Sequence, residues 1–355
     1  MPVAANPSPK QESFVYISRG FVGANIAVAT SALIDCQSCM PSTYMFLHPA
    51  TGRFDDSLQF SDVTNVGYVY YFPAGALQKA GEYTTVPRAG HNVGTLKVQV
   101  TEDLAVTNAA AYDFCSSFEG AACPAYSIAP DSIATVFGSD SVAPTTSIPQ
   151  GAPLAPSLAG TSVTVLDSAG LSRAAQLYFV SPRQINFLVP RETALGPARV
   201  TITTPSGTRQ IDTVVTSVHP GIFTANANGL GAPAAQLVRV RSDGSQAMEN
   251  AFAWDTTALQ WGPAPIAAGT DKVHLILYGT GIRNGADAVL HCWCGSTAMT
   301  NMPVAYAGPQ GEFAGLDQIN VQLPTFPSTD SSFFSYLFWL TVGGKDSNPF
   351  RLWFH

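Results

Sequence analysis

Residues 178–190 read YFVSPRQINFLVP, and residues 312–324 read EFAGLDQINVQLP. Both stretches contain Gln-Ile-Asn, end in proline and alternate apolar with polar residues, as a half-buried strand does. Two further matches flank them in the same order: IATVFGSDSV (133–142) with HLILYGTGIR (274–283), and ARVTITTPSG (198–207) with LFWLTVGGKD (337–346). Three matches in one order predict two copies of a single β-sandwich.

The rest of the chain continues the same pattern. Short runs rich in Val, Ile, Thr, Phe and Tyr are separated by turns that draw on 30 Gly and 26 Pro, and no long stretch shows the period of an amphipathic helix. We therefore predict an all-β chain of tandem immunoglobulin-like antiparallel β-sandwiches. The predicted domains are an N-terminal sandwich at residues 1–128, repeat 1 at 129–219 and repeat 2 at 220–355.

Residues 129–355 also resemble a known family. The segments APDSIATVFGSDSV, LAGTSVTV, YFVSPRQINFLVP, HPGIFTANANGLGAP, LYGTGIRNG and GLDQINVQLP are similar to the Solibacter-type uncharacterised C-terminal domain of secreted acidobacterial proteins. That resemblance implies an extracellular tandem β-sandwich module with no assigned catalysis. The chain departs from the family in its CWC segment and in the aromatic-rich residues 245–268, and both places are candidates for a function of its own.

Composition argues against several classes of protein. Charged residues make up 12% of the chain, the net charge is −7 and only five residues are lysine, so a basic face for nucleic acid is not expected. The longest apolar stretch, residues 333–342, is too short for a membrane-spanning helix of about 20 residues. The first residues lack a signal-peptide pattern, so either the numbering begins near the mature N-terminus or export uses another route.

The cysteines favour an oxidising compartment. They fall into three close pairs, CQSC, CSSFEGAAC and CWC, which predict disulfides and an extracellular or cell-surface location: Cys36, Cys39, Cys115, Cys123, Cys292 and Cys294. Local pairing is one of 15 connectivities that six cysteines allow. Buried free thiols and a zinc site joining CQSC to HCWC are the alternatives, although CxC is poor spacing for structural zinc.

No motif in the sequence indicates catalysis. GxSxG, HExxH and a correctly spaced phosphate loop are all missing, and no histidine shares a short motif with another histidine or an Asp-Ser set. Asp55 and Asp56 fit a solvated turn better than a calcium site, since no further carboxylates follow at alternate positions. We predict a protein that is not an enzyme and that uses neither metal nor cofactor.

One repeated motif and one tyrosine are predicted to have structural roles. Gln184 and Asn186 in one repeat match Gln318 and Asn320 in the other, and we expect their amides to bond neighbouring backbone at a strand corner. Tyr83 follows a glycine at a strand start, as in the tyrosine corner of immunoglobulin-like folds, and an ordinary strand tyrosine is the alternative.

The tryptophans are the candidate contact residues. Trp254 and Trp261 lie in the aromatic-rich segment and are expected to be exposed, whereas Trp339 lies in a core-like strand and is expected to be buried. Exposed aromatic side chains mark either a glycan site or a protein interface. A polysaccharide-binding module is therefore one functional hypothesis.

The sequence favours a structural role, as a self-assembling extracellular subunit of a filament, tube or surface layer, or as an adhesin, and the polysaccharide-binding module is the alternative. Sheet edges are commonly protected by lysine, and five lysines leave most edges of three sandwiches unprotected. The apolar terminal segments QESFVYISRG and PFRLWFH could pair with a neighbouring sheet edge, and the alternative is that both pair inside their own domains. The predicted partners are thus copies of the same chain, joined through sheet edges and terminal strands, or a polysaccharide.

Overall fold

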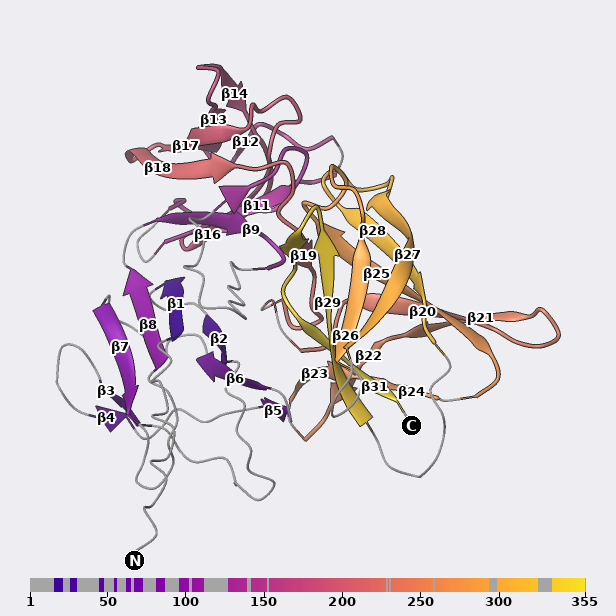
Figure 1. Ribbon diagram of the computed structural model, residues 1–355. Coiled ribbons are helices and arrows are strands. Elements are labelled where there is room, and N and C mark those ends of the chain that lie inside the picture. Colours follow the sequence, from indigo (N-terminus) through magenta and orange to yellow (C-terminus); the bar gives the residue numbers. More distant parts are fainter. Residues whose placement is uncertain are drawn as a thin grey trace, which may run out of the picture. The chain divides into compact units, whose positions relative to one another are not determined.

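The structure of the chain is a computed structural model (Figure 1). It describes side chains in residues 104–111, 127–138, 142–151, 153–227, 229, 231–257, 259–267, 269–292, 300–324 and 336–354. For strands β1 to β8 and for residues 293, 299, 334 and 335 it describes the backbone only. All regular elements in this described part are strands, so it contains no helix that could cross a membrane.

The chain divides into two compact units. Unit 1 comprises Met1–Thr101 and Ser117–Cys123, and unit 2 comprises Glu102–Ser116 and Pro124–His355. Unit 1 contains one sheet in the order β1-β8-β7-β3-β4 and another in the order β2-β6-β5. Its strands are β1 (Tyr16–Phe21), β2 (Ile26–Thr30), β3 (Met45–Leu47), β4 (Phe54–Asp55), β5 (Asp62–Thr64), β6 (Gly67–Phe72), β7 (Gly81–Val86) and β8 (Leu96–Thr101).

Unit 2 begins with repeat 1, which has two sheets. One has the order β15-β16-β11-β9, and the other has the order β10-β18-β17-β13-β12 with β14 beside β13. The strands are β9 (Ala105–Asn108), β10 (Ser127–Ile128), β11 (Ile133–Phe137), β12 (Ser157–Leu158), β13 (Thr161–Leu166), β14 (Ser172–Ala174), β15 (Gln176–Ser181), β16 (Gln184–Leu188), β17 (Gly196–Thr204) and β18 (Gly207–Val215).

Repeat 2 follows in the same unit. Its main sheet runs β21-β20-β25-β28-β27-β26-β29-β31-β24, with β19 beside β25 and β30 beside β29, and β22 pairs separately with β23. The strands are β19 (Gly221–Ile222), β20 (Ala235–Val240), β21 (Gln246–Asn250), β22 (Phe252–Asp255), β23 (Gln260–Pro263), β24 (Pro265–Ile266), β25 (Lys272–Thr280), β26 (Val289–Trp293), β27 (Met299–Pro309), β28 (Asp317–Gln322), β29 (Phe334–Val342), β30 (Lys345–Asp346) and β31 (Phe350–Phe354).

The two repeats have the same topology. The order β9-β11-β16-β15 in repeat 1 corresponds to β20-β25-β28-β27 in repeat 2, and β10-β18-β17-β13 corresponds to β24-β31-β29-β26. β10 pairs in parallel with β18 in repeat 1, and β24 pairs in parallel with β31 in repeat 2. These are the two sheets of an immunoglobulin-like sandwich. The predicted all-β fold of tandem immunoglobulin-like sandwiches is confirmed.

Repeat 1 starts upstream of the predicted boundary at residues 128 and 129. Strand β9 pairs with β11, and Val106 of β9 is fully buried in the core of repeat 1. Repeat 2 carries its own addition at the corresponding connection, because β21, β22 and β23 are inserted between β20 and β24. This insertion coincides with the aromatic-rich segment that the sequence analysis singled out.

The alternation of the Gln-Ile-Asn strands accounts for the two cores. Ile185 and Phe187 of β16 are fully buried, and Ile319 and Val321 of β28 take the same places in repeat 2. Burying each such side chain contributes roughly 1.5–3 kcal/mol. The polar residues between them point outward, which leaves the Gln and Asn amides on the outer face of each sheet.

Both terminal strands pair within the chain. β1 pairs in parallel with β8, and β31 lies between β29 and β24. The inward pairing that the sequence analysis kept as an alternative is therefore what the structure shows for both segments. Self-association through other sheet edges stays a prediction.

Candidate functional site

The insertion in repeat 2 presents a row of aromatic side chains. β22 and β23 pair antiparallel, with Phe252 opposite Pro263 and Trp254 opposite Trp261. Directly opposed residues share a face, and so do residues two apart along a strand. Phe252, Trp254, Trp261 and Pro263 thus lie on one face of a two-stranded ribbon, which we call the aromatic hairpin (residues 252–263).

The rings of the aromatic hairpin pack edge to face. The Trp254 and Trp261 centroids are 5.3 Å apart at an interplanar angle of 77°, and those of Phe252 and Trp261 are 5.4 Å apart at 84°. Trp254 is 49% exposed and Trp261 is 38% exposed. Trp261 is therefore the central ring, packed on both sides, and Trp254 is the outer ring with the larger free surface.

One side chain outside the hairpin fixes its position. Asn226 Nδ2 donates to the Trp261 carbonyl at 2.7 Å, and Asn226 Oδ1 accepts from the Trp261 N–H at 2.9 Å. This amide imitates a neighbouring strand and satisfies both backbone groups of Trp261. At the base of the hairpin, the Ala264 N–H donates to the Ala251 carbonyl at 3.0 Å. The tryptophans are thus held in place before any ligand arrives.

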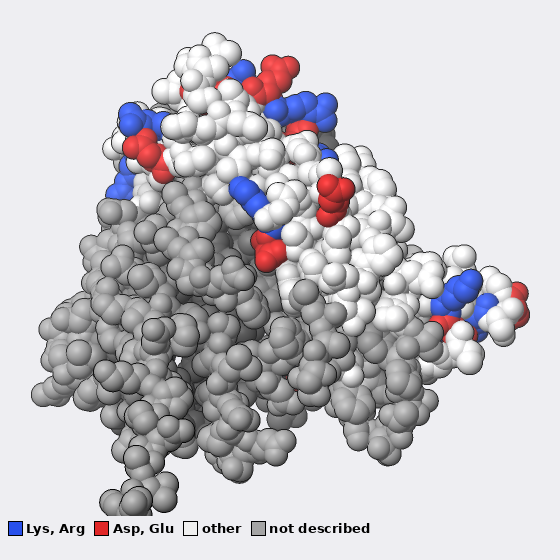
Figure 2. Space-filling view, in the orientation of Figure 1, with Lys and Arg blue, Asp and Glu red and all other residues white. Residues whose placement is uncertain are grey.

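Charge is sparse around this site. Asp255 is the only charged residue among residues 252–263, and its carboxylate accepts from the Thr257 N–H at 2.8 Å. In the view of Figure 2, charged side chains gather on repeat 1 and on the β20–β21 hairpin, and a few lie on the part of repeat 2 next to repeat 1. With one charged residue among its twelve, the aromatic hairpin suits a neutral ligand.

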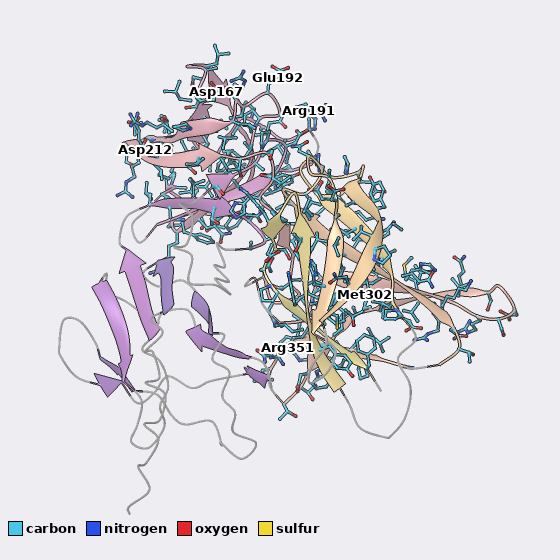
Figure 3. All side chains as sticks on the ribbon, viewed as in Figure 1. Asp167, Arg191, Glu192, Asp212, Met302 and Arg351 are labelled. Carbon is cyan, nitrogen blue, oxygen red and sulfur yellow. The ribbon has the colours of Figure 1, made fainter. Side chains whose placement is uncertain are left out.

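Two buried carboxylates are the groups most able to do chemistry, and both are fully engaged. Asp167, on repeat 1 (Figure 3), accepts from the N–H groups of Ala169, Leu171 and Ala194, each at 3.0 Å, and pairs with Arg173. The Ala194 N–H is the largest cause that lowers the pKa of Asp167, and burial acts against it. This carboxylate holds a loop together and is committed to its hydrogen bonds.

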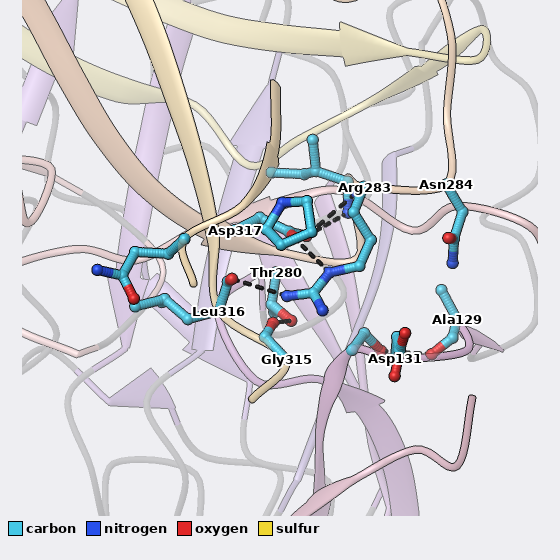
Figure 4. Close-up of polar contacts among 12 residues, drawn as sticks. Ala129, Asp131, Thr280, Arg283, Asn284, Gly315, Leu316 and Asp317 are labelled. Atoms are coloured by element: carbon cyan, nitrogen blue, oxygen red, sulfur yellow. Dashed lines mark hydrogen bonds and ion pairs between the residues drawn. The ribbon is translucent and has the colours of Figure 1, made fainter. Parts of the chain in front are cut away.

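Asp317 of β28 is the second buried carboxylate (Figure 4). Its Oδ1 accepts from Arg283 Nε at 2.6 Å, and its Oδ2 accepts from the N–H groups of Ile282 at 2.8 Å and Arg283 at 3.2 Å. Arg283 Nη2 also donates to the Leu316 carbonyl at 2.7 Å. Burial raises the pKa of Asp317, whereas these donors lower it. The two carboxylates lie in different repeats, and each is held by its own set of donors.

The Asp317 cluster borders the junction of the two repeats. Thr280 Oγ1 donates to the Gly315 carbonyl and accepts from the Ile133 N–H, both at 2.7 Å, and Asn284 Nδ2 donates to the Pro130 carbonyl at 3.0 Å. Asn108 Nδ2 donates to the His219 carbonyl at 2.5 Å and to the Thr280 carbonyl at 3.1 Å. Three of these bonds join repeat 1 to repeat 2: Ile133 to Thr280, Asn284 to Pro130, and Asn108 to Thr280.

A glycine completes the junction. Gly281 has φ of +75°, and a Cβ there would lie 2.1 Å from the His219 carbonyl oxygen. Only glycine fits this combination of positive φ and backbone contact. The junction is therefore closely packed at this position.

The side-chain amides of the two Gln-Ile-Asn strands have other hydrogen-bond partners than the sequence analysis predicted. Gln184 Nε2 donates to Asn186 Oδ1 at 2.8 Å, and Gln318 Nε2 donates to Asn320 Oδ1 at 2.9 Å. The expectation of backbone partners was wrong, because residues two apart on a strand point the same way and their amides meet each other first. The identical bond in both copies fits the predicted structural role.

The structure describes the side chain of Trp339 but not that of Tyr83. Trp339 is half-buried on the outer face of β29 and stacks on His291 at 5.1 Å, so the expectation that it is buried was wrong. Its neighbour Phe338 points into the core instead. Tyr83 lies in β7 opposite Val98, and Asp55 ends β4, but the side chains of both are outside the described residues, as is the whole of Asp56.

Cys292 is the one cysteine with a described side chain. It is fully buried and is present as a disulfide, and the other five cysteines are outside the described residues. Within the described ranges, no three His, Cys, Asp or Glu side chains gather as a metal ion would require. The disulfide framework and the predicted lack of enzymatic activity and cofactor both stay predictions.

Comparison with known proteins yields similarity of fold. No family model and no curated protein matches the chain, so the Solibacter-type resemblance stays a prediction. Among solved structures, the SGBP-B protein of the Bacteroides ovatus mixed-linkage glucan utilization locus, in complex with a mixed-linkage heptasaccharide, is 12% identical with a TM-score of 0.26, covering 100% of this chain and 69% of that one.

Two other similar structures are built from immunoglobulin domains. A three-domain fragment of titin is 11% identical with a TM-score of 0.20, covering 96% of this chain and 94% of that chain. The Dpr2 Ig1-Ig2 complex with DIP-Theta Ig1-Ig3 is 11% identical with a TM-score of 0.21, covering 95% of each chain. At these TM-scores the similarities support no inference about this chain.

Proposed function

We propose that this chain is a non-enzymatic extracellular protein that binds neutral polysaccharide through the aromatic hairpin. The supporting observation is the exposed Trp254 ring, which stands beside Trp261 on a ribbon fixed by Asn226. The flat face of a sugar ring carries C–H groups and stacks on an aromatic ring, while its hydroxyls remain free for polar partners. A contiguous patch of exposed aromatic side chains marks a candidate binding site, whereas a single exposed one is ordinary.

The geometry favours contact with one or two sugar residues. Because the two indole planes are nearly perpendicular, they do not form the flat strip that a crystalline glycan surface would need. They form a corner in which one ring offers its face and the other its edge. Holding the rings in place beforehand lowers the entropy cost of binding.

Removing both indoles should abolish this binding. We expect the double variant Trp254→Ala, Trp261→Ala to bind at least tenfold more weakly to the polysaccharide that the native chain retains. The measurement is affinity electrophoresis through gels containing laminarin, xylan, galactomannan, dextran or hydroxyethylcellulose. Phe313→Ala is the matched control, since it removes another exposed aromatic side chain, 59% accessible, from the same repeat.

The outcomes separate clearly. Unfolding of each variant in urea shows whether the fold survives the substitutions. Equal retardation of the double variant and the native chain would contradict the proposal, and so would free migration of the native chain in every gel.

A structural subunit is the second candidate function, and one strand favours it. β21 forms the end of the repeat 2 sheet, pairs only with β20 among the described strands, and exposes Met248 to 66%. The hairpin of β20 and β21 extends away from the sandwich (Figure 1). An open edge strand is a template for pairing with another copy of the chain.

The mass of the native particle tests this second candidate. Self-assembly predicts that light scattering gives a mass that rises with protein concentration and that electron microscopy shows regular particles. A particle with the mass of one chain at every concentration would contradict assembly. That result would leave the polysaccharide proposal unaffected.

A further inference from the structure

The outer face of the repeat 2 sheet carries a second aromatic platform, centred on Tyr306. β28 lies between β25 and β27, so its outward residues have a neighbour on each side. Asn320 pairs with Ile276 and with Tyr306, and Gln318 pairs with Tyr278 and with Gly308. These two adjacent rows bring one exposed tyrosine next to the two amides of the Gln-Ile-Asn strand.

The Tyr306 ring lies along its own strand. Its hydroxyl donates to the Pro309 carbonyl at 2.7 Å, three residues further along the chain. A Cβ on Gly308 would lie 2.9 Å from the Tyr306 Oη and 3.0 Å from its Cζ, so the ring passes over the space that a side chain at 308 would fill. Tyr306 is nevertheless 42% exposed. One ring face therefore rests on β27, and the other faces solvent.

The neighbouring amides have unused hydrogen-bonding groups. Gln318 Nε2 donates to Asn320 Oδ1 at 2.9 Å, and Tyr278 Oη donates to Gln236 Oε1 at 3.0 Å. Among the described residues, Gln318 Oε1, Asn320 Nδ2 and Gln236 Nε2 have no protein partner. One acceptor, Gln318 Oε1, and one donor, Asn320 Nδ2, thus belong to β28, the strand next to Tyr306, whereas Gln236 lies on β20, three strands away. Neither row contains a charged residue.

Repeat 1 provides an internal comparison. At the corresponding positions, Asn186 pairs with Phe179 and Gln184 pairs with Ser181. Ser181 occupies the place of Gly308, so the space under a flat ring is filled, and Phe179 is only half-buried rather than exposed. Asn186 Oδ1 also accepts from Thr135 Oγ1 at 2.8 Å. The amide pair belongs to the fold of both repeats, whereas the platform exists only in repeat 2.

We propose that this platform is a second subsite for the same neutral polysaccharide. One sugar residue stacks on the solvent face of Tyr306, and its hydroxyls accept from Asn320 Nδ2 and donate to Gln318 Oε1. The inference rests on the proposed function for its ligand class, but it concerns residues that the aromatic hairpin does not include. An uncharged row of ring and amides fits a polyhydroxylated neutral ligand better than an apolar protein surface.

Three substitutions test the platform. Tyr306→Ala removes the ring, Gly308→Ala displaces it by filling the space beneath, and Tyr306→Phe keeps it and deletes the hydroxyl. With laminarin, xylan, galactomannan, dextran and hydroxyethylcellulose as probes, we expect the first two variants to bind the retained polysaccharide at least fivefold more weakly. Tyr306→Phe should stay within about twofold, because the stacking face survives. Side-chain amide resonances of Asn320 and Gln318 should shift when an oligosaccharide of that polymer is added.

The outcomes distinguish the two proposals. If Tyr306→Ala binds like the native chain while the tryptophan double variant does not bind, the platform is wrong and the hairpin site stands. If Tyr306→Ala loses binding while the double variant keeps it, the platform stands and the hairpin site is wrong. Unshifted Asn320 and Gln318 amides at saturating oligosaccharide would overturn the platform, and a native chain that binds no probe would overturn both.

Discussion

Replacing Asp317 with asparagine should lower the free energy of unfolding of repeat 2 by about 3–5 kcal/mol. The Arg283 side chain is only 10% exposed and would keep its charge without a charged partner. The N–H groups of Ile282 and Arg283 would also lose a carboxylate acceptor, and the amide group of asparagine would meet them with a donor on one side. Removing one partner of a buried pair costs more than the pair itself contributes.

Tryptophan fluorescence can isolate this effect, because all five tryptophans of the chain lie between residues 254 and 353, within repeat 2. Urea unfolding monitored in this way reports on repeat 2 even if the other sandwiches unfold separately. Asp346→Asn is the matched control within repeat 2, since the Asp346 carboxylate accepts from Thr341 Oγ1 on the exposed surface of the same repeat. That substitution should cost about 0–1 kcal/mol. A loss below about 1 kcal/mol for Asp317→Asn would show that the buried pair does not hold the repeat together.

The repeated Gln-Ile-Asn strand was sufficient to predict the fold. The alternation of this strand buries its isoleucine in both repeats. The strands before and after it also match between the repeats, so the same strand order was expected twice. The boundary of repeat 1 could not be located in this way. β9 is short, and its membership is decided by pairing with β11, a contact that neither strand's own sequence reveals.

The candidate site was only partly predictable. Trp254 and Trp261 stood out because aromatic residues in an unusual insertion are expected at the surface. Tyr306 did not stand out, because simple alternation puts it on the same face as Val304, which packs against the core. The register shifts between these two residues, so that Val304 lies opposite Val321 and Tyr306 lies opposite Asn320. A bulge of this kind reverses the face of every residue beyond it.

Asn226 illustrates a different limit. It is 35 residues away from Trp261 in the sequence, and both of its bonds go to backbone groups. No property of the tryptophan identifies such a partner, because every residue except proline offers the same N–H and C=O. The support of the hairpin therefore becomes visible only when the chain is folded.

The junction between the repeats should weaken as the pH falls. His219 Nδ1 of the ring lies 2.5 Å from the Ser127 carbonyl, and the backbone N–H of His219 donates to the Gly281 carbonyl at 3.0 Å. The pKa of His219 is lowered from 6.5 to about 4, chiefly by burial; the bond to the Ser127 carbonyl opposes this shift, and the positive charge of Lys345 adds to it. Between these two pKa values the unfolded chain binds a proton that the folded chain does not. Stability is therefore full above about pH 6.5 and declines as the pH falls toward 4.

We expect the free energy of unfolding to fall by about 2 kcal/mol through this group between pH 7 and pH 4.5. The full shift in the pKa of His219 would lower the free energy of unfolding somewhat more, but the His219 side chain keeps partial contact with solvent. The measurement is urea unfolding at both pH values for the native chain and for His219→Gln, which cannot take up the proton. The variant should be less stable at pH 7 and should lose about 2 kcal/mol less on acidification, because carboxylates shared by both chains contribute equally. Equal losses in the two chains would contradict the proposal that burial lowers the pKa of His219 in the folded chain.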